Sequence, residues 1–406
     1  MMRHVGRLGR AWLVALPGLV AGAAHPAFAA SLRDAFEAAW QRTPDARALA
    51  AQRGVQEARR YAGGQLFPAA PFLQGEATSD RFLSNQGFNS YALEAGTPVW
   101  LPGEGTATIR QADAGLAELQ ARLAELRLAV AGAVRAAVGD VEVAAVALPP
   151  LERRAAAARD LAAATARRAS RGESPAADAL LSRSEAVTAE AALAEQRAAL
   201  EVAAARFALL TGQATVPNLA SDAAPPDQPA RDHPRLLAAR RAVASAEAGL
   251  RLAQATLRES PIVSLQGRTE RQLYTEHYDT RLGLIVRLPL ATEGRNRPRL
   301  AAAEAELTRA EASLAVAERE VLIEQRQARL GLGAAGQQLR LAEQAARLLA
   351  QRRVQLDQAY TVGEMPLVEV IRARSAAFEA ELNRARAKAA QDRARSRLDQ
   401  ALGVLP

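Results

Sequence analysis

Apolar residues recur at every seventh position through two long stretches of this chain. They are Ile109, Leu116, Leu123 and Val130 in the first stretch, and Leu300, Leu307, Leu314 and Val321 in the second. Most positions three residues further along are alanine or leucine. A seven-residue repeat of this kind predicts long helices that pack as left-handed coiled coils, and the alanines let neighbouring helices approach closely.

Much of the rest of the chain also favours helix, because Ala, Leu, Arg, Glu and Gln dominate its composition. We expect helices at residues 31–66, 105–147, 151–170 and 176–211 in the first half, and at 234–259, 298–360 and 367–402 in the second. Two features are expected to loosen the longest helices near their middles. They are Pro149-Pro150 in the first half, and Gly331, Gly333 and Gly336 in the second.

Four segments alternate with a period of two instead, at residues 70–82, 88–100, 262–271 and 277–290. In the last of them, Leu282, Leu284, Val286 and Leu288 alternate with Arg281, Gly283, Ile285 and Arg287. Strands of about ten residues with one apolar side suit a membrane-spanning sheet. Two hairpins lying on a soluble helical core would show the same alternation, so the pattern alone leaves both readings open.

The order of these elements occurs twice, about 191 residues apart. The clearest match is that Gly172-Glu173-Ser174-Pro175 returns as Gly363-Glu364-Met365-Pro366. Matching glycine and proline positions carry weight because these residues fix turns. We therefore expect two equivalent repeats, at residues 30–215 and 231–406, joined by a proline-rich linker at 216–230.

The first 29 residues have the composition of an export signal. Three arginines precede an apolar run at residues 11–20, and Ala27-Phe28-Ala29 has the form of a cleavage site. After it, no apolar run reaches the 18 residues that would predict a membrane-spanning helix. Membrane insertion would therefore have to use the strands.

Charge and residue usage exclude several classes of function. The net charge is +8, and removing the three signal arginines leaves +5. The basic residues are interleaved with glutamate, as on solvated helix faces, and aromatic residues make up only 4%, which argues against nucleic-acid binding. The chain has no cysteine, and His233 and His277 stand apart, so neither a metal site nor a cofactor is expected. No catalytic constellation is visible, and we expect no enzyme.

Four strands cannot close a barrel, and open sheet edges are not tolerated in lipid. Known membrane barrels have at least about eight strands. The membrane reading therefore requires several copies of the chain, with two copies giving eight strands and three giving twelve.

The duplicated order of helix, hairpin and long helices resembles the TolC-like outer-membrane efflux family over residues 31–404. Leu288-Pro289-Leu290, followed by Glu293-Gly294-Arg295-Asn296-Arg297, resembles its CzcC-type branch. The resemblance implies a homotrimer with a 12-stranded barrel in the outer-membrane lipid, continued by an α-helical tunnel through the periplasm. It implies a periplasmic adaptor (membrane fusion protein) and an inner-membrane resistance-nodulation-division pump as partners. The CzcC likeness suggests heavy-metal resistance, with metal cations as the cargo, and drugs or organic solutes stay open as alternatives.

Within this family frame, two sets of residues are candidate sites. The turns that would meet the adaptor contain Gly172, Glu173 and Pro175 in the first repeat, and Gly363, Glu364 and Pro366 in the second. Asp178 and Glu369 occupy the same repeat position just beyond these turns, and six such carboxylates in a trimer would form a cation-attracting pore constriction. An acidic residue near a helix start also simply offsets the helix dipole, which is the plainer interpretation.

A second function, from another class, fits the long helices. A soluble periplasmic coiled-coil protein, either an adaptor or a structural rod, would also show long heptad stretches. The two equivalent repeats with embedded amphipathic strands favour the efflux channel over this alternative.

Overall fold

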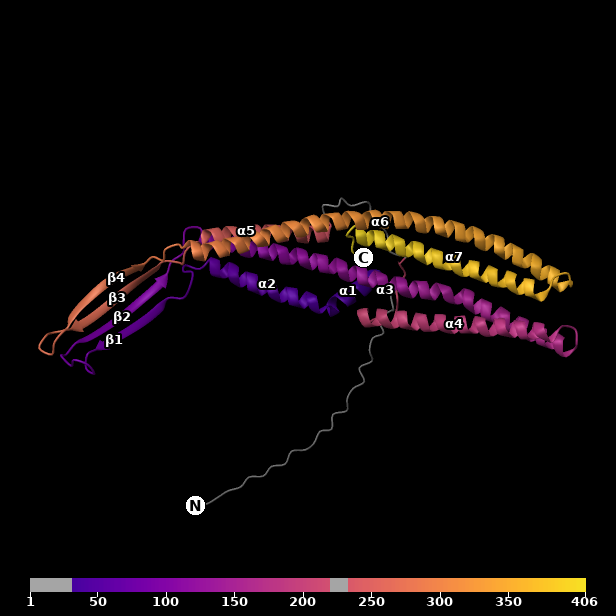
Figure 1. Cartoon of the computed structure of the whole chain (residues 1–406), viewed down its shortest axis with the longest axis horizontal. Coiled ribbons are helices and arrows are strands. Elements are labelled where there is room, and N and C mark those ends of the chain that lie inside the picture. The colour runs from indigo at the N-terminus through magenta and orange to yellow at the C-terminus, as the bar shows by residue number, and fades with distance from the viewer. Residues whose placement is uncertain (1–30, 220–232) are drawn as a thin grey trace, which may run out of the picture.

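The computed structural model describes residues 31–219 and 233–406. The export signal expected at residues 1–29 and most of the linker expected at 216–230 lie outside these residues. The molecule is a long arch with a small sheet at one end and two helix turns at the other (Figure 1).

The first half consists of a short opening helix followed by three helices and two strands. The opening helix is α1 (Leu32–Arg42), followed by α2 (Pro44–Gly63), β1 (Phe72–Ser79), β2 (Asn89–Pro98), α3 (Glu104–Ser170) and α4 (Ala176–Thr211). The second half contains α5 (Pro234–Ala255), β3 (Ile262–Arg271), β4 (Asp279–Arg287), α6 (Glu293–Thr361) and α7 (Leu367–Ala401). After α1, both halves run helix, hairpin, long helix, helix, as the sequence predicts. The exact bounds of the two repeats, residues 30–215 and 231–406, stay a prediction.

The expected first helix is in fact two helices. Thr43 has an extended backbone (φ −72°, ψ 114°) and serves both as the C-cap of α1 and as the N-cap of α2. The cause is Pro44, since the residue before a proline is pushed out of the helical region. A capping box at Ser31 and Asp34 starts α1, with Ser31 Oγ accepting from the Asp34 amide at 3.1 Å.

The expected loosening of the long helices is wrong, because α3 and α6 run without interruption for 67 and 69 residues. At ~1.5 Å per residue, each helix is about 100 Å long. Pro149 and Pro150 lie inside α3, where each removes one amide donor from the helix, and packing supports the turn around them. Leu151 belongs to a buried cluster with residues of α4, and Gln196 of α4 donates to the Ala144 carbonyl at 3.0 Å.

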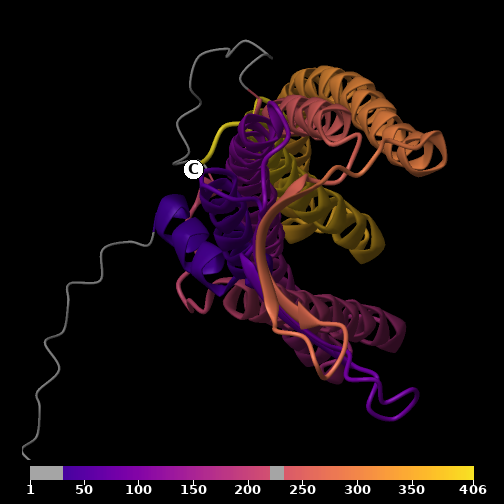
Figure 2. The same ribbon diagram turned by 90° about the vertical axis from the view of Figure 1, so that its left-hand side faces the viewer.

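The helix α3 is the centre of the molecule, since α1, α2, α4, α5 and α7 all pack on it. The largest core cluster joins α1 to the middle of α3 and the end of α4, around Phe36, Val134, Val138 and Phe207. Elsewhere the buried positions are mostly alanine, so the helices meet at close range without a thick core. Figure 2 shows the helices gathered behind the sheet end.

The four strands form one antiparallel sheet in the order β1-β2-β3-β4. The central pairing joins β2 of the first half to β3 of the second, with Tyr91 opposite Thr269 and Ala95 opposite Leu265. Each hairpin supplies an outer strand, so β1 and β4 each have one edge with no strand beside it in the described chain. Within the described residues, no helix packs extensively on either face.

The register places the predicted apolar positions on one face of this sheet. Because side chains alternate sides along a strand, residues paired across the sheet share a face. One row is Leu73–Ala95–Leu265–Leu284, and the next is Gly75–Leu93–Gly267–Leu282. The opposite face carries the polar residues Glu76, Glu94, Arg268, Glu270 and Arg281. The sheet is therefore amphipathic, as the alternation predicts.

No helix within residues 31–219 and 233–406 combines the length and the apolarity needed to cross a membrane.

The α1 cluster supports a direct test of packing. Phe36 is 2% exposed in that cluster, whereas Phe82, in the loop between β1 and β2, is 93% exposed. Phe36→Ala is expected to lower the free energy of unfolding by about 3–5 kcal/mol, because it leaves a cavity. Phe82→Ala, the matched control, should change it by less than about 0.5 kcal/mol. Urea unfolding of the two purified variants measures both, and equal effects would contradict the packing of α1.

Candidate functional site at the two helix turns

The turns between α3 and α4 and between α6 and α7 have the same backbone geometry. Gly172 and Gly363 have φ angles of +76° and +84°, which favour glycine. The Glu173 amide donates to the Arg168 carbonyl at 2.9 Å, and the Glu364 amide donates to the Ala359 carbonyl at 3.0 Å. This bond across six residues is the mark of a Schellman helix end, so the two helices finish in the same way.

The prolines of the two turns start the next helices in the same way. Pro175 and Pro366 are the N-caps of α4 and α7, with φ and ψ of −60° and 144° and of −71° and 148°. Their carbonyls accept from the amides of Asp178 and Glu369, each at 3.1 Å. The two carboxylates thus stand at the same place in the first turn of α4 and of α7.

The surroundings of the two carboxylates differ. Glu369 forms an ion pair with Arg372, one helical turn later, at 2.7 Å. Asp178 is half-buried and makes no ion pair with any described residue. Both positions suit a carboxylate that offsets a helix dipole, and the pair at Arg372 reduces the free charge at Glu369.

A contact between the two hairpins near the turns was not anticipated from the sequence. The Arg168 guanidinium of α3 lies 5.7 Å from the ring centroid of Tyr360 in α6, and its Nη1 donates to the tyrosine hydroxyl at 3.3 Å. The 191-residue offset places Ala169 opposite Tyr360, so the repeat gave no signal for this pair. Further along, Glu185 of α4 accepts from Arg154 of α3 at 2.8 Å and from Ser375 of α7 at 3.2 Å. These contacts tie the two helical hairpins together.

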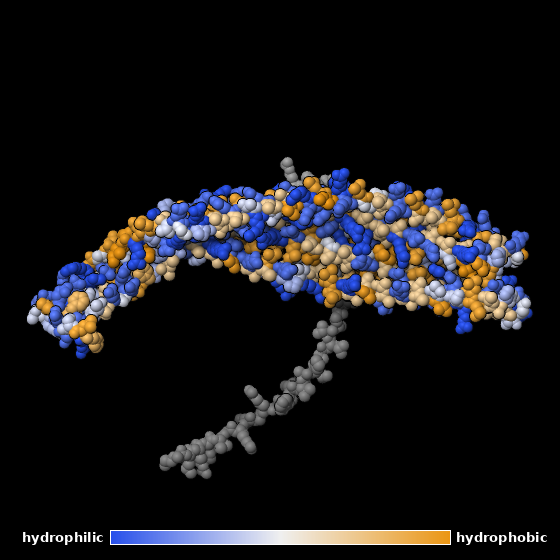
Figure 3. Space-filling view, viewed as in Figure 1, coloured by the Kyte–Doolittle hydropathy of each residue, from blue (hydrophilic) through white to orange (hydrophobic). Residues whose placement is uncertain are grey.

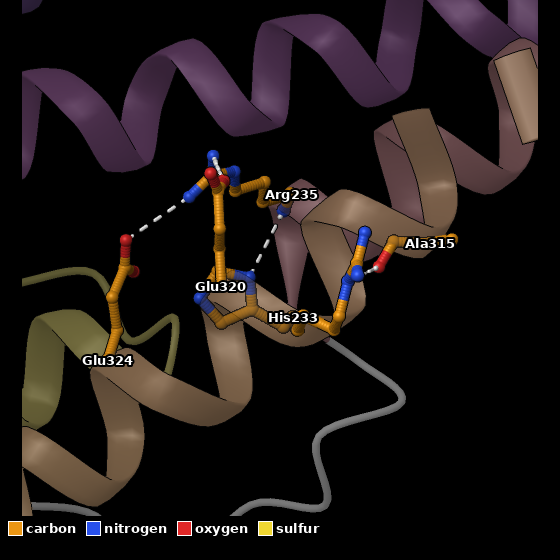
Figure 4. A network of polar contacts seen from close by, with 6 residues as sticks. His233, Arg235, Ala315, Glu320 and Glu324 are labelled. Carbon is orange, nitrogen blue, oxygen red and sulfur yellow. Dashed lines mark hydrogen bonds and ion pairs between the residues drawn. The ribbon is translucent and has the colours of Figure 1, made fainter. Parts of the chain in front are cut away.

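His233, one of the two isolated histidines, caps the start of α5 (Figure 4). Its Nδ1 accepts from the Arg235 amide at 3.2 Å at the start of α5, and the side chain is 3% exposed. Burial, and then the charge of Arg235, lower the pKa of His233, so the imidazole is neutral as this cap requires. The Arg235 guanidinium reaches α6, where it pairs with Glu320 and with Glu324 at 3.2 Å. No group of metal-ligating side chains occurs in the described parts of the chain.

The sheet carries aromatic residues at both of its ends. Those at the loop end are Phe82, Phe88, Tyr91, Tyr274 and Tyr278, and those near the helices are Tyr61, Phe67, Phe72 and Trp100. At the loop end, the Tyr274 hydroxyl donates to Asn85 Oδ1 at 2.7 Å, which links the two hairpin loops. Apolar surface is visible over the strands at the left of Figure 3.

A comparison with known protein families gives a match in the second half of the chain. Residues 226–404 match the family model described as Outer membrane efflux protein. The match covers 179 of the 406 residues, somewhat less than half of the chain. Proteins of this family are transport ducts, so the expectation that the chain is not an enzyme is confirmed. No curated protein matches the chain by sequence.

Solved structures extend the fold to the first half. The outer membrane protein VceC from Vibrio cholerae aligns with a TM-score of 0.72 and 19% identity, over 92% of this chain and 96% of that chain. A CusC structure gives 0.74 and 17%, over 92% of both chains, and the outer-membrane channel OprN gives 0.72 and 20%, over 92% and 89%. The chain shares the fold of these proteins along nearly its whole length. The resemblance to TolC-like proteins is therefore supported for the fold.

Proposed function

We propose that the chain is the outer-membrane channel of a tripartite efflux system, and that it acts as a homotrimer. The observation that carries this proposal is the sheet. Its apolar face is exposed and its outer strands have open edges, so a single copy has a face that water disfavours and edges that lipid cannot satisfy. Leu73, Leu265 and Leu282 on that face are 71%, 51% and 74% exposed.

Three copies remove both problems at once. If β1 of each copy pairs with β4 of the next, twelve strands close a barrel with no free edge. The apolar face then turns to the lipid and the polar face to the lumen, and Tyr91, on the apolar face at the loop end, suits the aromatic girdle of an outer-membrane barrel. The long helices continue from the barrel as a periplasmic tunnel.

The alternative, a soluble periplasmic coiled-coil adaptor, fits the sheet poorly. In water, the sheet's exposed leucines would form an apolar patch next to unpaired strand edges, which favours aggregation. The partners that we propose for the channel are a periplasmic adaptor and an inner-membrane resistance-nodulation-division pump. The CzcC-type residues after β4 support metal cations as the cargo.

The assembly is open to a direct test. We expect the protein to stay with the outer membrane after a high-salt wash, and the detergent-solubilised protein to have the mass of three chains. A protein released by salt, or a stable monomer in bilayers, would contradict the barrel, because an open four-stranded sheet has unsatisfied edges in lipid.

We propose that Asp178 and Glu369 of three copies form the acidic pore constriction at the narrow end of the tunnel. Low-dielectric walls focus the field of such charges, so cations should be enriched there. Asp178→Asn with Glu369→Gln should reduce the cation preference of reconstituted trimers at low salt, and the difference should shrink as salt screens it. Glu173→Gln with Glu364→Gln is the matched control, because it removes two charges from the exposed turns. An unchanged preference in the first double variant would leave these carboxylates as helix-start residues.

We propose that the two turns at Gly172 and Gly363 meet the adaptor. Apart from its two chain neighbours, no described residue has an atom within 4 Å of the position that a Cβ would take at Gly363, so Gly363→Val acts through its positive φ, at a cost of about 1–2 kcal/mol. Efflux in cells should be lost while trimer abundance in the outer membrane stays normal. Gly331→Val, in α6 and also with open space around it, is the control.

A Gly363→Val protein that fails to accumulate would not separate folding from docking. Glu173→Lys with Glu364→Lys, which leaves both turns intact, then decides the matter. Normal efflux in that variant would mean that the turns only connect helices.

A further inference from the structure

The second half carries a group of arginines where the sheet meets the helices. Arg258 lies in the connection from α5 to β3, and Arg295, Arg297 and Arg299 lie in the first two turns of α6. We call these four residues the arginine cluster. Only Glu259 and Glu293 offset it in the same two segments, which leaves a net charge of +2 per chain.

Two contacts bring the cluster together. Arg295 pairs with Glu259 at 2.8 Å, and Arg299 donates to the Thr256 carbonyl and hydroxyl at 3.0 and 3.1 Å. These bonds hold the connection that contains Arg258 against the start of α6. They use Arg295 and Arg299 but leave the other two arginines available.

Arg258 and Arg297 are the two available charges. Arg258 is exposed and makes no ion pair with any described residue. The side chain of Arg297 is 83% exposed, and its ion pair with Glu293 is long, at 3.9 Å. A helix N-terminus disfavours cations, so these positions are not explained by the stability of α6.

Exposed leucines lie beside the cluster and continue the apolar face of the sheet. Leu288 and Leu290, between β4 and α6, are 56% and 80% exposed. Leu288 follows the alternation of Leu284 and Val286, so it extends the face that the proposed barrel turns to the lipid. Apolar side chains next to exposed arginines are suited to a ligand with both an acyl chain and an anionic headgroup.

The first half differs at the same level. Residues 99–109, which lead from β2 into α3, contain no arginine, and the first two turns of α3 contain one, Arg110, where those of α6 contain three. Trp100 in this connection donates from Nε1 to the Gln65 carbonyl at 2.9 Å. Tyr61 and Leu66 nearby are 72% and 79% exposed. One repeat thus offers aromatic and apolar groups at the sheet–helix junction, and the other offers arginines.

We propose that the arginine cluster, with Leu288 and Leu290, binds the headgroups of anionic phospholipids in the leaflet nearest the helices. The proposal rests on the outer-membrane channel proposed above, which places this junction at the membrane surface. A basic residue near an anionic surface contributes about 1 kcal/mol, or about fivefold in binding for each arginine. Three copies would carry three such sites, each flanked by the aromatic junction of a first repeat.

The test uses purified trimers in nanodiscs of mixed phosphatidylglycerol and phosphatidylcholine. Native mass spectrometry of released trimers should show phosphatidylglycerol retained above its bulk fraction, and less so at high salt. Arg258→Gln with Arg297→Gln should lower that enrichment by at least about fivefold. Arg326→Gln with Arg347→Gln removes two charges from α6 away from the sheet and should leave the enrichment unchanged.

The outcomes separate this inference from the proposed function. Trimers that insert and show equal enrichment in both double variants would overturn the lipid site while leaving the channel intact. Wild-type protein that does not enter nanodiscs would overturn the channel itself. Leu290→Ser should also lower the retention of phosphatidylglycerol, and a loss caused by the arginine changes alone would overturn the part assigned to the leucines.

Discussion

The unpaired backbone groups at the outer edges of β1 and β4 limit the environments in which this molecule is stable. Within residues 31–219 and 233–406, β1 and β4 each pair with a strand on one side only, and no helix packs extensively on either face of the sheet. Such edges attract other strands, and in lipid they must be satisfied within the protein. The proposed pairing between copies would satisfy them and would close the amphipathic sheet into a barrel. The proposed trimer, the lipid contact and the tunnel all depend on this pairing.

The two halves share the same backbone turns but differ in the side chains around them. Each half ends its long helix with a positive-φ glycine and begins the next helix at a proline, so the two turns come out alike. The cross-hairpin pair of Arg168 and Tyr360 and the arginine cluster have no counterparts at the offset of 191 residues. A shared backbone thus supports surfaces that differ between the halves.

Much of this arrangement could be predicted from the sequence. The seven-residue spacing around Leu119 and Val321 identified the long helices, and the alternation around Leu282 identified a strand with the correct apolar side. Both signals are periodic and local, which is why they suffice. The break at Thr43 depends on the single residue Pro44 and was missed. The continuity of α3 through Pro149 was missed because it depends on tertiary packing against α4, which no local signal reports.

The pairing of strand edges between copies can be tested directly, because the chain has no cysteine. Gln74→Cys in β1 can be combined in turn with Arg281→Cys, Gly283→Cys or Ile285→Cys in β4, all on the polar face. Within one chain, β1 and β4 are three strand spacings apart, about 14 Å, which is too far for a disulfide. The account predicts that at least one combination gives covalent trimers in the outer membrane on oxidation. Chains that reside in that membrane yet remain single in all three combinations would contradict it.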